Sequence, residues 1–423
     1  MFRNMSRTSL ALGNLRAFVI LLVAGFHSSL AYVVFQPPLR PFSSPPWDWR
    51  AFPILDHVHW FGLDLFCAFQ YVFLMPFMFF LSGLFVWQSL ARKGVGAFLS
   101  DRLVRIGIPF VLGVYLLMPV AHYPVYRLTA PDPSLAAFWA QWIALPFWAS
   151  GPLWFLWHLL VLDTAAAALY RFAPGVGERL GSFAARAGDH PARYFVALAI
   201  VSALAYLPLA AIFAPWDLRQ VGPFAFQPGR VLHYVVYFFA GVSVGMVGIE
   251  RGLLRADGLL QRRWALWSAL ALVAFPAWML VTALTMENAP LGIGPLPQLD
   301  ALANLVFVLA SATACFAFAA VFLRFAGSHS RVADSLSANA YGIYLVHYLP
   351  VIWLQYLLLG LALPAVVKAA MVFGGALLAA WSATAAMRRT RIGAHVLGAD
   401  RRVTAAAQQV ANAGYSASVV SPP

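Results

Sequence analysis

Ten apolar segments, each about as long as a membrane helix, make up most of this 423-residue chain. Crossing the hydrocarbon core of a bilayer takes about 20 apolar residues in a helix. Only 10% of the residues are charged, although a soluble domain has about 25%. The chain therefore predicts an all-α, polytopic membrane helix bundle with about ten transmembrane helices. The segments are 15–35, 62–91, 104–121, 153–171, 194–213, 231–250, 265–286, 301–325, 339–360 and 364–387.

The net charge of +13 follows the loops of this bundle. With both termini in the cytoplasm, 21 of the 28 Lys and Arg residues lie in inner loops or tails. Cytoplasmic loops of membrane proteins carry such an excess. The sequence thus predicts an N-in, C-in orientation, and the positive charge does not indicate a nucleic-acid partner. The outer loops contain five arginines: Arg40, Arg50, Arg127, Arg219 and Arg230.

The chain is expected to form one membrane domain, residues 1–390, followed by a cytoplasmic tail. The tail, 391–423, is predicted to be disordered because its later part is small and polar. Two outer loops, 36–60 and 122–152, are rich in Pro and Trp, which indicates ordered turns. They could line the mouth of a polar cavity or simply cap the bundle at the interface. No pattern typical of a metal site is present.

The first apolar segment contains Arg16 and His27, although ionisable residues are costly in lipid. Eleven residues correspond to about 1100° of helix rotation and a rise of about 16 Å, so both side chains lie on one face. Arg16 is expected near the cytoplasmic end and His27 about halfway across. Arg16 could hold a phosphate or only set orientation; His27 could be a catalytic base, an acyl acceptor or a buried structural histidine.

Further polar residues of the apolar segments and inner loops are candidates for binding a substrate. Each has a structural alternative: close helix packing, the cytoplasmic excess of positive charge, or the aromatic belt at the interface. The candidates are Ser82, Arg102, Arg105, Trp154, His158, Asp163, Tyr344 and His347.

Taken together, these stretches resemble the integral-membrane acyltransferase family 3, which includes bacterial glycan O-acyltransferases. The matching elements occur in the family's order over nearly the whole chain. Asp64 of GLDLF is not assigned a role, because a longer apolar insert separates it from FFLSG than in the family pattern. The elements are Arg16 and His27 separated by ten residues, FFLSG (79–83), Arg102 with Arg105, LWFL (153–156), YFFAGVSVG (237–245) and YGIYLVH (341–347).

The resemblance implies a multi-pass protein of the bacterial inner membrane that takes an acyl group from cytoplasmic acyl-CoA. No bound cofactor is implied; acetyl-CoA or succinyl-CoA would be the donor substrate. The acceptor would be a hydroxyl of a periplasmic or cell-surface glycan, with membrane lipid around the bundle. His27 would be the catalytic residue and Arg16 would support donor binding. The wording of FFLSGLF and LWFL is most similar to the branch that succinylates periplasmic glucans.

These observations lead to a specific hypothesis with one rival. Arg16, Arg102 and Arg105 would neutralise CoA phosphates at the inner side. The thioester would then approach His27, which would deprotonate the incoming hydroxyl or carry the acyl group itself. The rival is a transporter or flippase for a lipid-linked saccharide or a small solute, since such proteins also contain buried polar residues.

Overall fold

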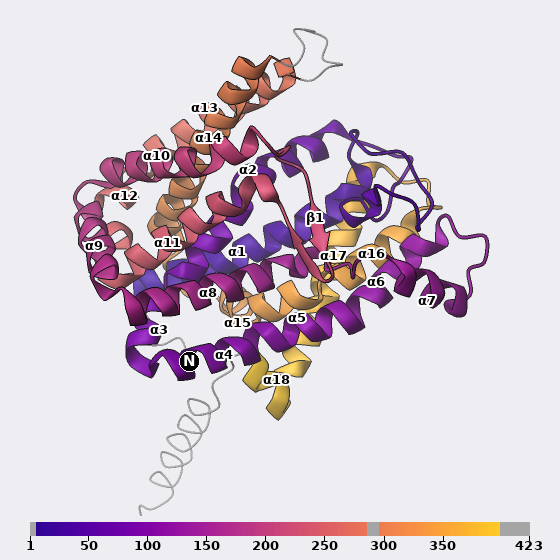
Figure 1. The fold of residues 1–423 in the computed structure, drawn as a ribbon, viewed down its shortest axis with the longest axis horizontal. Coiled ribbons are helices and arrows are strands. Elements are labelled where there is room, and N and C mark those ends of the chain that lie inside the picture. The colour runs from indigo at the N-terminus through magenta and orange to yellow at the C-terminus, as the bar shows by residue number, and fades with distance from the viewer. Residues whose placement is uncertain (1–5, 286–295, 398–423) are drawn as a thin grey trace, which may run out of the picture.

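The computed structural model describes residues 6–285 and 296–397, and these form a helical bundle (Figure 1). Within these residues, nine helical stretches are long and apolar enough to cross a membrane. A tenth span is formed by two helices bent by 65° at their junction. Each of the ten predicted segments corresponds to one of these spans, which confirms the predicted polytopic all-α bundle.

The spanning helices are α1 (Arg7–Ser29), α2 (Phe61–Gly83), α4 (Val95–Arg102) continued by α5 (Ile108–Leu112) and α6 (Met118–Arg127), α8 (Trp154–Phe172), α10 (Pro191–Ala210), α11 (Val231–Val247), α13 (Trp264–Thr285), α14 (Pro297–Phe325), the bent pair α15 (Arg331–Val346) and α16 (Tyr348–Leu358), and α17 (Ala365–Met387). The shorter helices are α3 (Val86–Lys93), α7 (Leu135–Ala144), α9 (Pro174–Ala185), α12 (Leu259–Arg262) and α18 (Arg391–Val396). A small hairpin consists of β1 (Arg219–Val221) and β2 (Phe224–Phe226), and 3-10 turns at Leu30–Tyr32, Asp48–Arg50, Gly151–Leu153 and Pro228–Arg230 complete the outer side.

Helix α1 lies in the middle of the bundle (Figure 1) and packs against α2, α14, α15, α16 and α17. It begins at Arg7, eight residues before the predicted segment, because the chain stays helical beyond its apolar stretch. His27 therefore lies in the last turn of the helix, and Arg16 lies well inside it.

The second apolar segment of the sequence contains Pro76, which favours a kink or a break in a helix. In the structure, α2 is nevertheless one continuous helix through that residue. The break comes after Gly83, where two turn residues separate α2 from α3. Helices α2 and α11 cross at this point. The backbones touch so closely that a Cβ on Gly241 would lie 2.0 Å from the carbonyl oxygen of Phe80. A Cβ on Gly245 would lie 2.0 Å from the carbonyl oxygen of Leu84, and a Cβ on Gly83 would lie 2.2 Å from the carbonyl oxygen of Phe238.

Replacing Gly241 with alanine is expected to destabilise the protein by about 1–3 kcal/mol, because the new methyl group must force two backbones apart. Gly374 in α17 is the matched control, since a Cβ there would meet no atom within 4 Å. Thermal unfolding in detergent should show a lower midpoint for Gly241→Ala than for Gly374→Ala. Equal midpoints would mean that α2 and α11 do not need this close approach.

One end of the bundle brings together several segments predicted to be cytoplasmic. The Arg7 guanidinium donates to the carbonyl of Arg324 at 3.1 Å, and the Asn14 amide donates to that of Ala326 at 2.7 Å. The start of α1 therefore lies beside the end of α14. Helix α18 forms the first part of the predicted tail and contacts Leu103–Gly107 of the third span; residues 398–423 lie outside the described part.

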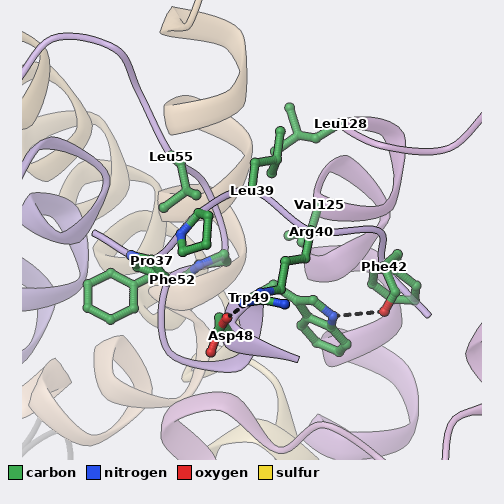
Figure 2. Close-up of a pocket in the computed structure, with 12 residues that line it drawn as sticks. Pro37, Leu39, Arg40, Phe42, Asp48, Trp49, Phe52, Leu55, Val125 and Leu128 are labelled. Atoms are coloured by element: carbon green, nitrogen blue, oxygen red, sulfur yellow. Dashed lines mark hydrogen bonds and ion pairs between the residues drawn. The ribbon is translucent and has the colours of Figure 1, made fainter. Parts of the chain in front are cut away.

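The opposite end is covered by outer loops that are ordered, as their composition predicts. The first of them folds on itself: the Trp49 indole donates to the carbonyl of Phe42 at 2.9 Å, and Arg40 pairs with Asp48 at 3.4 Å (Figure 2). Phe42 also stacks on Trp49, with ring centroids 4.6 Å apart. Asp64 accepts the backbone N–H groups of Val34 and Phe35, at 2.8 and 3.1 Å, and so fixes the chain where it leaves α1.

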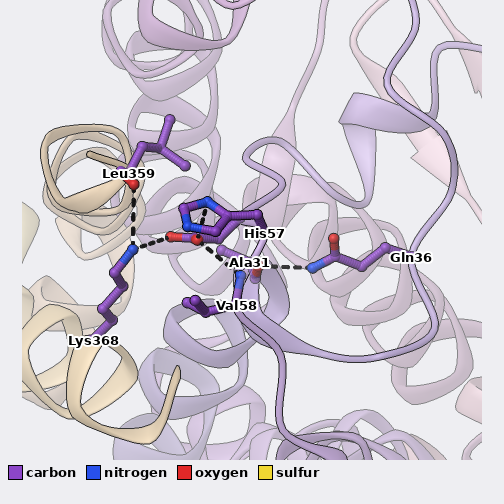
Figure 3. A network of polar contacts seen from close by, with 7 residues as sticks. Ala31, Gln36, His57, Val58, Leu359 and Lys368 are labelled. Carbon is purple, nitrogen blue, oxygen red and sulfur yellow. Dashed lines mark hydrogen bonds and ion pairs between the residues drawn. The ribbon is translucent and has the colours of Figure 1, made fainter. Parts of the chain in front are cut away.

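A buried ion pair attaches the same loop to α17. The ammonium of Lys368 lies 2.8 Å from the carboxylate of Asp56, and both side chains are 0% exposed. Figure 3 shows Lys368 extending toward this carboxylate and toward the carbonyl of Leu359. The backbone N–H of Asp56 donates to the carbonyl of Ala31, at the end of α1. The loop, α1 and α17 are thus held together next to the turn that contains His27.

Candidate active site

A cavity of about 690 Å³ extends into the bundle from the outer loops. Its walls come from the last turns of α1, one face of α2, the starts of α8 and α11, the bent pair α15–α16 and two outer loops. A volume of this size is typical of a small-molecule site. The helices and turns contribute His27, Gln70, Tyr71, Trp154, Gln227, Arg230, Tyr234, Tyr344 and Tyr348 to the lining. The outer loops contribute Trp47, Asp48, Arg50, Trp216 and Asp217.

His27 lines this cavity, and its hydrogen bonds fix the state of the ring. Its Nδ1 lies 2.9 Å from the carbonyl oxygen of Val23 and 3.3 Å from Nε2 of His347. The Nδ1 of His347 lies 2.7 Å from the carbonyl oxygen of Tyr344. A carbonyl only accepts hydrogen bonds, so in the neutral rings both Nδ1 atoms carry the proton. His347 Nε2 is then an acceptor for His27 Nδ1–H.

The other nitrogen of His27, Nε2, therefore keeps its lone pair. It has no hydrogen-bond partner within 6–285 and 296–397, and its ring lines the cavity. Tyr348 meets the ring edge-on at 5.3 Å, and the Gln355 amide donates to the backbone carbonyl of His27 at 2.8 Å. The ring is thus held on one side and open on the other, as a general base or a nucleophile requires.

A second polar cluster lies about three helical turns away, toward the inner end. The Arg16 guanidinium covers the ring of Phe85 at 4.0 Å and donates to the carbonyl of Leu81 at 3.4 Å. Arg102 is close enough to act on Arg16 electrostatically and forms an ion pair of 3.0 Å with the buried Asp163. The bent helix joins this cluster through the hydroxyl of Tyr341, which donates to the carbonyl of Arg105.

The predicted site residues therefore fall into two groups. His27, Trp154, Tyr344 and His347 meet at the outer cavity. Arg16, Arg102 and Asp163 meet at the inner cluster, beside the backbone of Arg105. The shared face of Arg16 and His27 connects the groups, although Arg16 does not line the cavity.

Three of the candidate binding residues do not line the cavity. The Ser82 hydroxyl donates to the carbonyl of Met78 at 2.8 Å within its own helix. His158 packs on Trp157, with ring centroids 3.8 Å apart, and its Nδ1 bonds to the carbonyl of Trp154. Asp163 pairs with Arg102 instead of facing the cavity. The rotation of α2 and α8 about their own axes explains why these side chains do not line the cavity: each lies on a face that turns toward a neighbouring helix.

The sequence also contains cavity residues that were not predicted. Gln70 is a single amide inside the apolar α2, and such an isolated polar residue is itself a signal of a site. Arg230 was counted as an outer-loop charge, yet it is only 2% exposed and faces the cavity. Tyr348 was noted for its helical spacing only, and its contact with His27 depends on the bend between α15 and α16.

Near the cavity mouth, the charges balance one another. Arg50 has Asp48 and Asp217 as electrostatic neighbours, and partial burial lowers the pKa of its guanidinium despite them. Its side chain donates to the backbone carbonyls of Trp47 and Pro46, at 3.3 and 3.1 Å. This mouth is therefore polar but close to neutral, so neutral polar molecules can enter it without crossing a strong field.

A family model described as an acyltransferase domain matches residues 10–385, which include both polar clusters, the cavity and all ten spans. No curated protein and no solved structure matches the chain. The matched motifs also account for much of the geometry, since FFLSG and YFFAGVSVG supply the glycines of the α2–α11 contact. The chain belongs to the acyltransferase 3 family and is a membrane-spanning acyltransferase.

Proposed function

We propose that this protein is an O-acyltransferase of the bacterial inner membrane. It moves an acetyl or succinyl group from cytoplasmic acyl-CoA to a hydroxyl of a periplasmic or cell-surface glycan. The observation that carries this proposal is the position of His27. Its unprotonated nitrogen faces a cavity that opens among the outer loops, and an arginine cluster lies on the inner side of the same helix face.

The outer cavity has the lining that a sugar requires. Aromatic rings of Trp47, Trp154 and Trp216 offer flat faces for the C–H groups of a sugar ring. The amides of Gln70 and Gln227 can exchange hydrogen bonds with hydroxyl groups. An acceptor that enters from the outer side would reach His27 in the wall of the cavity.

The inner cluster suits the phosphates of CoA. Arg16 has no carboxylate partner among the described residues, so its positive charge is available for an anion. Asp163 holds Arg102 in place and offsets part of its charge. The contacts of Arg16 with Phe85 and Leu81 close the way between the clusters, so the proposal includes movement of this side chain when the donor enters.

The chemistry follows from the free nitrogen of His27. The sugar hydroxyl gives its proton to Nε2 while its oxygen bonds to the thioester carbon. The C–S bond then breaks, and the imidazolium returns the proton to the departing CoA thiolate. In the other route, Nε2 attacks the thioester and passes the acyl group on to the hydroxyl. Both routes begin at the same nitrogen and yield the glycan ester and free CoA.

Replacing Arg16 with glutamine is expected to raise the KM for acyl-CoA by about tenfold or more, because a charge-assisted bond to phosphate is lost. The KM for the acceptor should stay nearly constant. Arg92→Gln is the control, since Arg92 is exposed at the end of α3 in a predicted inner loop. Initial rates measured against each substrate separate the two constants. A change confined to the acceptor KM would contradict the donor role of Arg16.

Mass spectrometry of cell-envelope glycans tests the proposed function itself. Cells that contain the protein should carry an acyl ester on one glycan, and cells without it should lack that ester. The mass difference identifies the acyl group, and fragmentation identifies the acceptor. A transporter or flippase would instead change the location or amount of a saccharide and leave its acylation unchanged.

A further inference from the structure

The outer cavity contains a buried cation that the acyl-transfer step does not use. Arg230 lies just before α11 and is 2% exposed. Its guanidinium lies over the rings of Tyr71 and Phe307, at 3.7 and 4.6 Å from their centroids, and donates to the carbonyl of Tyr71 at 3.2 Å. Its Nε is buried without a hydrogen-bond partner among the described residues.

No carboxylate among residues 6–285 and 296–397 pairs with this charge. The electrostatic neighbours of Arg230 are the hydroxyls of Tyr71, Tyr206 and Tyr234, which are neutral donors and acceptors. Arg50, at the mouth of the same cavity, contrasts with it because two aspartates lie beside that residue. Burying an uncompensated charge is costly, so such a residue is retained where an anion binds.

Gln70 adds a second polar group to the lining of the same cavity. It precedes Tyr71 in α2, and Arg230 bonds to the carbonyl of that tyrosine. Both the oxygen and the nitrogen of the Gln70 amide are buried without a partner among the described residues, while its side chain lines the cavity. The N–H groups of the Gln70 amide and the Nε–H of Arg230 therefore have no acceptor among the described residues.

We propose that Arg230 and Gln70 bind a carboxylate carried by a substrate of this cavity. This inference rests on the proposed function, because it assumes that an acyl group and an acceptor meet here. The carboxylate has two possible sources: the far end of a dicarboxylic acyl group, or an acidic sugar of the acceptor. A guanidinium beside an amide suits either source, since both present the same planar pair of oxygens.

A binding experiment tests this site without requiring turnover. The melting temperature of the purified full-length protein in detergent is measured with succinate and with glucuronate. Butyramide, glucose and sodium chloride of equal ionic strength serve as neutral and salt controls. The wild type should be stabilised by at least one of the two carboxylates beyond its neutral analogue. A response to succinate indicates the acyl group, and a response to glucuronate indicates the acceptor.

Variants assign the effect to Arg230. The apparent Kd for the active carboxylate should rise by about 30-fold or more in Arg230→Gln, because truncating one partner of a buried charged pair is costly. Gln70→Leu should weaken binding less. Arg127→Gln should leave it within about twofold, because Arg127 is exposed and does not line the cavity. The proposal is overturned if neither carboxylate stabilises the wild type, or if the stabilisation persists in Arg230→Gln. Arg230 would then be a cation that packs against two aromatic rings.

Turnover keeps this result separate from the proposed function. Succinyl-CoA and butyryl-CoA have acyl chains of equal length and differ by one carboxylate. Carboxylate binding without any acyl transfer would contradict the enzyme proposal and leave the anion site intact. Acyl transfer without carboxylate binding would support the enzyme proposal and contradict the anion site.

Discussion

His27→Ala and His27→Gln are expected to lose about 100- to 10,000-fold in acyl transfer, because neither side chain supplies a nitrogen lone pair to the cavity. Glutamine is the sharper variant, since it keeps a polar group of similar length at the end of α1. Glycan acylation is measured in cells that contain equal amounts of each protein. His59→Ala is the control, because His59 is exposed in the outer loop. Normal acylation by either His27 variant would contradict the mechanism.

His347 is a positioning residue in this account. It bonds to His27 and to the carbonyl of Tyr344, and it is fully buried. His347→Asn should lower kcat and leave the KM for acyl-CoA nearly unchanged, because the ring of His27 loses one of the two acceptors that fix it. The profile of kcat against pH should also shift, which a purely structural role would not produce.

The buried pair of Asp56 and Lys368 is expected to dominate the stability of the outer side. Lys368→Met leaves the buried Asp56 carboxylate with the backbone N–H of Val58 and the largely exposed ring of His57 as its remaining partners. The free energy of unfolding should therefore fall by about 3–5 kcal/mol. Replacing both residues, with Asp56→Leu and Lys368→Met together, should recover much of this loss. Thermal or denaturant unfolding in detergent measures both.

Asp189→Asn provides the control for this pair. Asp189 pairs with Arg255 at 3.1 Å, but the two side chains are 69% and 43% exposed. Such surface pairs contribute about 0–1 kcal/mol. If Lys368→Met unfolds no more easily than Asp189→Asn, the loop is not attached to α17 through this ion pair.

The spans could be predicted because lipid requires long apolar helices, and hydropathy reports this requirement directly. The start of the first helix was harder to predict. The residues before Leu15 are more polar, yet α1 continues through them to Arg7, and His27 lies in its last turn. Pro76 was expected to bend α2, but the chain breaks after Gly83, next to the glycines of α11.

The candidate site was predicted in part. The helical repeat places Arg16 and His27 on one face, and the structure adds partners that no local pattern contains: His347 lies 320 positions from His27 in the chain. Arg230 was missed because an arginine in a short outer loop resembles any surface charge. Ser82 and His158 were candidates for binding a substrate, and neither lines the cavity. Hydropathy gives no information on how a buried helix is rotated, so it could not separate them from residues such as Trp154.

The central claim is that His27 transfers an acyl group between a donor on the inner side and an acceptor on the outer side. Proteoliposomes with the purified protein in one orientation test it directly. Labelled acyl-CoA is supplied only at the inner face, and an oligosaccharide acceptor only at the outer face. The account predicts labelled oligosaccharide with wild-type protein and almost none with His27→Gln. Equal labelling by both proteins, or label transferred only when donor and acceptor share one side, would contradict it.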